Sequence, residues 1–193
     1  MSSQVHGAQK FDQTKRADIK FSEEAMKTVE LIISRYPQGK QKSALLPVLH
    51  VAQAEFGGWL SPEVMDYVAS ILNIKPIEVF EVASFYTMFN LKPVGKCVLE
   101  VCQTSSCWLN GAEDIVKYIE KKLNIKVGET TKDGMFTLKV AECLGSCGTA
   151  PMLQCGASFH ENLTYEKVDT IIDNYKVEGK LRSYTDLEYK NTL

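Results

Sequence analysis

Apolar residues recur every three or four positions through the first half of the chain, which is the spacing of helices with one buried face. Each of the apolar stretches begins at a capping residue or a proline, and these start signals are Ser22, Ser43, Ser61-Pro62 and Pro76. The apolar faces comprise Met26, Val29, Ile32, Ile33, Leu45, Leu46, Leu49, Ala52, Val64, Val68, Leu72, Val79, Val82, Ala83 and Tyr86. Together they predict a small helical bundle.

The pattern changes after Pro93-Val94-Gly95. The mostly apolar run at 97–101, interrupted only by Glu100, and the alternating run at 136–140 are typical of strands, and 152–155 is a shorter candidate strand. Two amphipathic helices are expected, one capped by Asn110 with Glu113 three residues later, and one capped by Thr164. The order strand, helix, strand, strand, helix predicts a compact α/β unit.

These patterns divide the chain into four segments. We expect a flexible N-terminal segment (1–18), a helical bundle domain (19–92), an α/β domain (93–176) and a C-terminal tail (177–193) that lies on the surface or on a partner. The predicted fold class is therefore a two-part α+β chain with its helical bundle first.

Composition narrows the possible functions. The chain has 193 residues, 45% hydrophobic and 24% charged, which is enough to bury a core. Its formal net charge of −2 argues against nucleic-acid binding, because phosphate binding needs surplus Lys and Arg. No apolar run has the length of a membrane span, and the polar N-terminal segment lacks the apolar region of a secretory signal. We therefore expect no direct membrane insertion and a cytoplasmic location.

All six cysteines lie in the second half. Cys102 and Cys107 form a C-x4-C pair, and Cys143 and Cys147 form a C-x3-C pair, each where a predicted strand gives way to a loop. In a reducing compartment, clustered cysteines indicate a metal site more often than disulfides. Four cysteine thiolates are the ligand set of a 2Fe–2S cluster, so the motif predicts one such cluster.

The loop residues suit a negatively charged cluster. Gly145 and Gly148 let the backbone turn its N–H groups inward, and Ser105 and Ser106 supply hydroxyl donors. The helix expected from Asn110 would point its positive end toward the same region. Trp108, beside Cys107, either screens the cluster from water or is an ordinary packing residue.

Cys97 has the same spacing to Cys102 as Cys102 has to Cys107, but strand geometry argues against it as a ligand. The rise of about 3.3 Å per residue would separate Cys97 and Cys102 by roughly 16 Å. Cys97 is therefore expected to be a core cysteine. Cys155 is interpreted as structural, with a nearby thiol or a substitute ligand as the alternatives.

Other chemistries fit less well. A structural zinc site also uses four cysteines but commonly has a C-x2-C knuckle, and that spacing, which a thioredoxin-type enzyme also needs, does not occur here. A Rieske centre needs two histidine ligands, and His6, His50 and His160 all lie away from the motif. Nucleotide-binding glycine motifs are absent, so no NADH or flavin site is expected in this chain.

Four sequence strings together resemble the thioredoxin-like 2Fe–2S subunit of respiratory complex I. They are Cys102-Gln-Thr-Ser-Ser-Cys107-Trp-Leu-Asn-Gly, Gly128-Glu-Thr-Thr-Lys-Asp-Gly134-Met-Phe-Thr, Glu142-Cys143-Leu-Gly-Ser-Cys147 and Ala150-Pro151. The run 78–89 resembles the helical region of the same family, and the likeness covers roughly 20–176. This chain departs from the family after Pro151, where the family usually shows an apolar strand and an acidic turn and this chain has Met152-Leu-Gln-Cys155-Gly-Ala-Ser-Phe-His160 without the acidic pair.

The resemblance implies a C-terminal thioredoxin-like α/β 2Fe–2S ferredoxin domain, with Cys102, Cys107, Cys143 and Cys147 as the cluster ligands. It also implies that the chain passes single electrons within NADH:quinone oxidoreductase and performs no bond chemistry itself. The implied partners are the FMN- and NADH-binding flavoprotein subunit and other peripheral-arm subunits at the inner membrane. An equivalent subunit of an NAD-linked hydrogenase or formate dehydrogenase is the alternative, and a zinc-stapled structural module is the alternative of another class.

Overall fold

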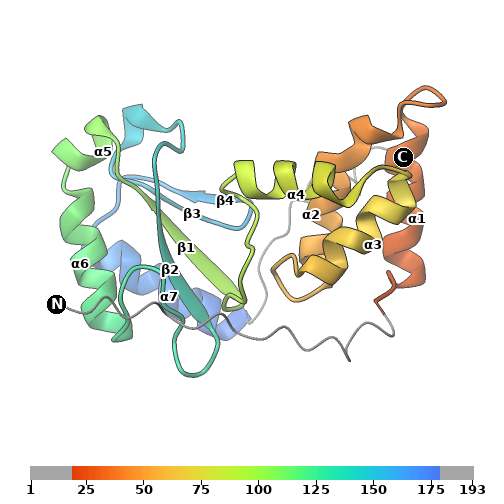
Figure 1. Cartoon of the computed structure of the whole chain (residues 1–193). Helices are drawn as coiled ribbons and strands as arrows, with labels where there is room; N and C mark the ends of the chain where they lie inside the picture. Colours follow the sequence, from red (N-terminus) through yellow and green to blue (C-terminus); the bar gives the residue numbers. More distant parts are fainter. Residues whose placement is uncertain (1–18, 179–193) are drawn as a thin grey trace, which may run out of the picture.

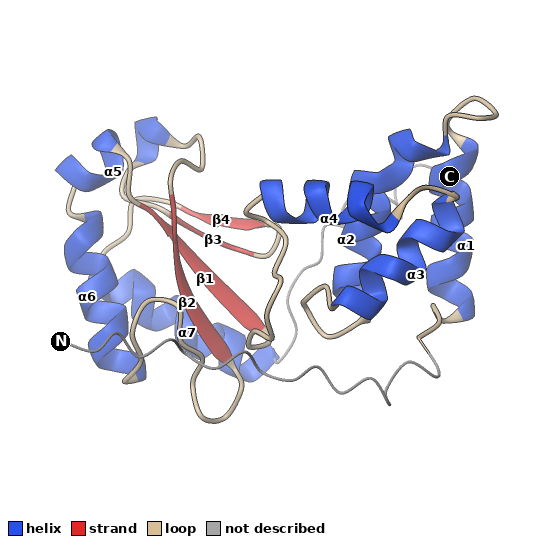
Figure 2. Cartoon of the chain, viewed as in Figure 1, coloured by secondary structure: helices blue, strands red, loops and turns tan. Residues whose placement is uncertain are grey.

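The computed structural model describes residues 19–178, so the predicted segment 1–18 and most of the predicted tail lie outside the described residues. Four helices come first, as the pattern predicts, and a mixed α/β region follows (Figures 1 and 2). The first part contains α1 (Glu23–Ser34), η2 (Gln41–Ala44), α2 (Leu45–Glu55), α3 (Pro62–Leu72) and α4 (Pro76–Phe85). The second contains β1 (Cys97–Cys102), α5 (Ser105–Leu109), α6 (Ala112–Leu123), β2 (Phe136–Ala141), η3 (Cys147–Thr149), β3 (Leu153–Cys155), β4 (Ser158–His160) and α7 (Tyr165–Glu178).

Three of the predicted helix caps are confirmed. The Ser22 hydroxyl accepts a hydrogen bond from the Ala25 N–H at 3.2 Å. Ser61 accepts one from the third residue after it, also at 3.2 Å, and Pro62 occupies the first helical position of α3. Thr164 accepts the equivalent bond at 3.2 Å at the start of α7. Each cap satisfies a backbone donor that the first helical turn leaves unpaired.

Two predicted caps are wrong, and in both cases an extra short helix intervenes. Ser43 lies inside η2, and α2 begins after it without a side-chain cap. Asn110 ends α5 and donates from Nδ2 to the Ser106 carbonyl at 2.8 Å. The cap of α6 is instead Gly111, whose φ of 85° lies in the left-handed region that glycine adopts without strain.

The sheet has the strand order β2-β1-β3-β4. β1 pairs with β2 in parallel, and β3 is antiparallel to both β1 and β4. A parallel pair needs a long crossover connection, which α5 and α6 provide. The pattern did not predict β4, whose three residues Ser158-Phe-His160 include one apolar side chain.

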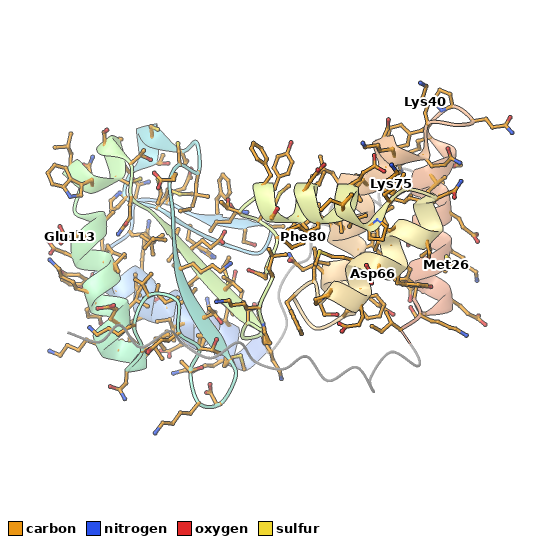
Figure 3. The ribbon with its side chains drawn as sticks, viewed as in Figure 1. Met26, Lys40, Asp66, Lys75, Phe80 and Glu113 are labelled. Atoms are coloured by element: carbon orange, nitrogen blue, oxygen red, sulfur yellow. A yellow bond between two sulfur atoms is a disulfide. The ribbon has the colours of Figure 1, made fainter. Side chains whose placement is uncertain are left out.

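Helices α6 and α7 contact each other and cover one face of the sheet. Ile119 of α6 is fully buried there, whereas Glu113, labelled in Figure 3, points away from the sheet and pairs with Lys117 at 3.0 Å. The same core contains Leu99 and Leu138 from the central strands. Burying a side chain of this size stabilises the fold by about 2 kcal/mol.

A second, separate core lies among the first four helices and includes Val29, Leu49 and Val68. Asn90, in the connection to β1, links the two regions. Its backbone carbonyl accepts from the Leu60 N–H, and its side-chain oxygen accepts from the ammonium group of Lys139 in β2. A buried polar side chain therefore marks the junction between the helices and the sheet.

The connection from the helices enters the sheet through Gly95. A Cβ atom at this position would meet the backbone of Met135 and Phe136 at 2.9 Å, so only glycine fits. The N–H of Gly95 donates to the Thr137 hydroxyl at 2.6 Å, on the face of β2 opposite to α6 and α7.

No described helix is long and apolar enough to cross a membrane.

Candidate metal centre

Parallel pairing of β1 and β2 brings the two cysteine motifs together. Cys102, the last residue of β1, is paired with Ala141, the last residue of β2. The N–H of Gln103 extends this ladder by donating to the Ala141 carbonyl at 3.0 Å. Because the carboxyl ends of parallel strands lie at the same edge, the segments 103–107 and 142–151 leave the sheet side by side.

Hydrogen bonds fasten one segment to the other. The Thr104 hydroxyl donates to the carbonyl of Glu142, and the Ser106 hydroxyl donates to the carbonyl of Cys147 at 2.9 Å. The backbone N–H of Cys102 donates to the carbonyl of Met152 at 3.1 Å. Cys102 to Ser106 thus hold both ends of the second cysteine segment.

The four motif cysteines are all free thiols, but their surroundings differ. Cys102, at the end of β1, is 3% exposed, and Cys107, on α5, is 2% exposed. Cys143 and Cys147 lie exposed on the second segment. The first pair is therefore fixed within the core, and the second pair is presented from the surface.

The two buried thiols have opposite pKa shifts. Burial raises the pKa of Cys102, but a hydrogen bond with the Thr104 hydroxyl, 3.3 Å from Sγ, and bonds from the backbone N–H groups of Thr104 and Leu144 leave the pKa below its ordinary value. Burial raises the pKa of Cys107, as do its hydrogen bond with Cys102 and the charges of Cys102 and Cys147. Neighbouring thiolates thus oppose one another, and a bound cation would relieve that opposition.

The residues fit an iron–sulfur cluster in type and in grouping. Four free thiols lie on two segments that are joined by hydrogen bonds, and the Cys107 thiol interacts electrostatically with Cys102 and with Cys147. Within 19–178, no three His, Cys, Asp or Glu side chains are close enough to grip a single metal ion. Four cysteine thiolates are the ligand set of a 2Fe–2S cluster, and four cysteines also form structural zinc sites, so the donor set by itself fits both groups.

The second segment is shaped by a glycine and by a carboxylate. Gly145 has a φ of +81°, as expected for a backbone that turns its N–H groups inward, whereas Gly148 does not adopt a positive φ. The Glu161 carboxylate accepts hydrogen bonds from the hydroxyls of Ser146 and of Thr149, the latter at 2.7 Å, and these bonds lower its pKa. Glu161 was not predicted from the sequence, since one acidic residue among many carries no local signal.

The remaining sequence-predicted residues have clear positions. Trp108 is 59% exposed beside Cys107, so it is not a core packing residue. Cys97 lies in the core as expected, and it is joined to Cys155 in a disulfide. Cys155 is buried and its sulfur is bonded to Cys97, which agrees with its structural interpretation, and the alternative of Cys155 as a substitute ligand is wrong.

Comparison with known families supplies independent information. The family model described as thioredoxin-like 2Fe–2S ferredoxin matches residues 29–176. The chain is 46% identical over 160 residues to one of the subunits of the NADH-quinone oxidoreductase of Rickettsia felis, covering 83% of this chain and 96% of that protein. It is 42% identical over 165 residues to NADH dehydrogenase (ubiquinone) flavoprotein 2, mitochondrial, of Dictyostelium discoideum, covering 86% and 67% of the two chains.

Among solved structures, the chain is similar to part of an NAD⁺-reducing NiFe-hydrogenase in its H₂-reduced state. The TM-score is 0.60 at 19% identity, and the match covers 75% of this chain but only 23% of the hydrogenase chain. At this identity the likeness concerns the fold alone.

Proposed function

Because the chain belongs to the thioredoxin-like 2Fe–2S ferredoxin family, we propose that it is the 2Fe–2S electron-transfer subunit of an NADH:quinone oxidoreductase. The observation that carries the proposal is the set of four free thiols on two hydrogen-bonded segments at one edge of the sheet. The names of relatives that are about as long as this chain support the choice of complex. The hydrogenase likeness, at 19% identity, does not favour that alternative.

In this proposal Cys102, Cys107, Cys143 and Cys147 hold the cluster. When bound, the cluster supplies one-electron transfer. The residues of the chain set its surroundings: burial of the first pair excludes water, and the backbone N–H groups of Thr104 and Leu144 donate toward Cys102. Such burial and donors are how a protein tunes the reduction potential of an iron–sulfur centre.

The partners and location form part of the same proposal. The chain would exchange electrons with the FMN of an NADH-binding flavoprotein subunit in the peripheral arm, on the cytoplasmic side of the inner membrane, without catalysing a reaction itself. We also propose that 19–92 and 93–176 are separate domains flanked by the segments 1–18 and 177–193. The two buried cores, one on each side of residue 93, support that division.

The test is an electron paramagnetic resonance spectrum of the full chain, purified anaerobically and reduced with dithionite, with iron and zinc assayed on the same sample. We expect about two irons per chain and the rhombic signal of a reduced 2Fe–2S cluster. Cys102→Ser and Cys143→Ser should each lose the signal.

The matched control is the double variant Cys97→Val/Cys155→Val, which removes two cysteines outside the motif and should keep the signal. About one zinc per chain with no iron and no signal would overturn the proposal in favour of a zinc-stapled module. Co-purification with a flavoprotein subunit or with a hydrogenase subunit separates the two kinds of NAD-linked complex.

A further inference from the structure

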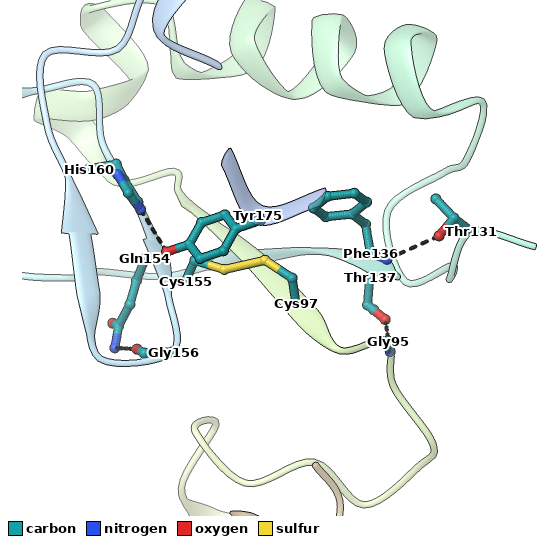
Figure 4. The surroundings of a disulfide bond; sticks show 10 residues. All are labelled: Gly95, Cys97, Thr131, Phe136, Thr137, Gln154, Cys155, Gly156, His160 and Tyr175. Atoms are coloured by element: carbon teal, nitrogen blue, oxygen red, sulfur yellow. Dashed lines mark hydrogen bonds between the residues drawn. A yellow bond between two sulfur atoms is a disulfide. The ribbon is translucent and has the colours of Figure 1, made fainter. Parts of the chain in front are cut away.

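Outside the motif, Cys97 and Cys155 meet in the core of the sheet region (Figure 4). Their Cα atoms are 6.4 Å apart, within the range that a disulfide spans. In the β1–β3 ladder Cys155 is paired with Leu99, and Cys97 lies two positions before Leu99 on the same face of β1. The two cysteines are therefore diagonal neighbours, and their sulfur atoms are joined.

This pair lies at the opposite end of β1 from the candidate metal centre. Cys97 begins the strand and Cys102 ends it, so the strand rise separates their Cα atoms by roughly 16 Å. A disulfide takes two electrons, whereas a 2Fe–2S centre transfers one at a time. The thiol chemistry of Cys97 and Cys155 is therefore separate from that of the four motif cysteines.

The surroundings of the pair limit access to it. Cys97 and Cys155 are 2% and 0% exposed, and the nearby side chains include Phe136 and Tyr175 (Figure 4). Tyr175 belongs to α7, and its hydroxyl lies 3.1 Å from Nε2 of His160 on β4. An attacking thiolate must touch a sulfur atom, so exchange requires the end of α7 to open locally.

We propose that Cys97 and Cys155 are a reversible dithiol–disulfide site, separate from the cluster ligands, that exchanges with low-molecular-weight disulfides and thiols. The two thiols reduce one disulfide molecule RSSR to two RSH, and one S–S bond forms between Cys97 and Cys155 as the S–S bond of RSSR breaks. The two thiol protons leave on the RSH products, and the reverse reaction restores the dithiol.

The disulfide form fastens β1 to β3. Only three residue pairs join these strands, and Met152, directly before β3, accepts the backbone hydrogen bond of Cys102. The bond closes a loop of sequence separation 58 that contains all four motif cysteines. The Cys97–Cys155 disulfide therefore limits how far the segments 103–107 and 142–151 can move apart. Its effect on a cluster held by these segments rests on the proposed function.

The first experiment maps the bond in the full chain. The protein is equilibrated anaerobically in mixtures of reduced and oxidised glutathione, denatured with N-ethylmaleimide and no reductant, digested, and analysed by mass spectrometry. We expect a linked Cys97–Cys155 peptide whose fraction rises with the disulfide content of the buffer. Alkylation of both cysteines at every buffer composition, or linkage of either one to a motif cysteine, would overturn the proposal.

The second experiment measures thermal unfolding of the metal-free chain with and without dithiothreitol. Because a disulfide restricts the unfolded chain, reduction should lower the melting temperature by about 10 °C. The control, Cys97→Val/Cys155→Val, should melt at the same temperature in both conditions. Equal melting temperatures for the oxidised and reduced native chain would overturn the proposal.

Neither readout involves iron, so failure of the cluster assignment and failure of this site are distinguishable. In the reconstituted protein, the disulfide form should release iron to a chelator several-fold more slowly than the dithiol form. Equal release rates would remove the link to the cluster segments and leave the thiol chemistry standing on the first two experiments.

Discussion

The two cysteine segments are built in different ways. Cys102 and Cys107 sit on β1 and α5, with nearly fully buried side chains and backbones held by regular structure. Cys143 and Cys147 lie exposed on a segment whose regular structure within 142–152 is the short η3. Contacts from outside hold that segment, namely the hydroxyls of Thr104 and Ser106 and the carboxylate of Glu161.

This difference indicates that the first segment is rigid before a metal binds, whereas the second depends on its contacts for order. Segments with few buried apolar contacts open locally at a lower free energy than strands and helices do. The strand-mounted pair is therefore preorganised, and the second pair gains its order from the contacts it makes. Metal binding contributes free energy to whichever ligand segment it orders, and here that is chiefly the second one.

The largest effect is expected where the second segment enters the core. Met152 is fully buried, and Met152→Ala should lower the free energy of unfolding by about 3 kcal/mol, because it leaves a cavity beside β1. Urea denaturation of the metal-free chain measures this change. Met152→Leu keeps the volume and should cost less than about 1.5 kcal/mol, so equal losses for both variants would contradict the packing argument.

An intermediate effect is expected at the contact between the segments. Thr104→Val removes the hydroxyl that donates to the Glu142 carbonyl, and a bond of this kind contributes about 1 kcal/mol. Amide hydrogen exchange at 144–146 should rise about fivefold while exchange in β1 stays unchanged. Thr104→Ser keeps the hydroxyl and should exchange as the native chain does. A rise spread evenly over both segments would show that they are not independent.

The smallest effect is expected at Glu161, which is exposed and therefore screened by solvent. Its pKa is lowered below the ordinary 4.5 by the Ser146 and Thr149 hydroxyls, so its stabilisation is present above that pH and is lost as the pH falls through the folded-state pKa. Glu161→Gln should speed amide exchange at 146–149 near neutral pH. The ratio of variant to native rates should shrink below pH 4.5, and a ratio independent of pH would exclude the carboxylate as the cause.

Local sequence was sufficient for much of the fold. Ser22, Ser61 and Thr164 each cap a helix as predicted, because a cap depends on residues within one helical turn. The exclusion of Cys97 from the ligand set was also local, since it used only the rise of one strand. Cap predictions from local sequence failed where an additional short helix intervened, as at Ser43 and Asn110.

By itself, the sequence determined the helical first half, the main strands, the four-cysteine motif and the family it resembles, because each of these depends on nearby residues or on fixed spacing. Tertiary structure alone decided three other features. They are the parallel register that aligns Cys102 with Ala141, the contact of Glu161 with the second segment, and the joining of Cys97 to Cys155. Each involves residues that are distant in the chain, and their meeting is set by strand order and core packing, which no local pattern encodes.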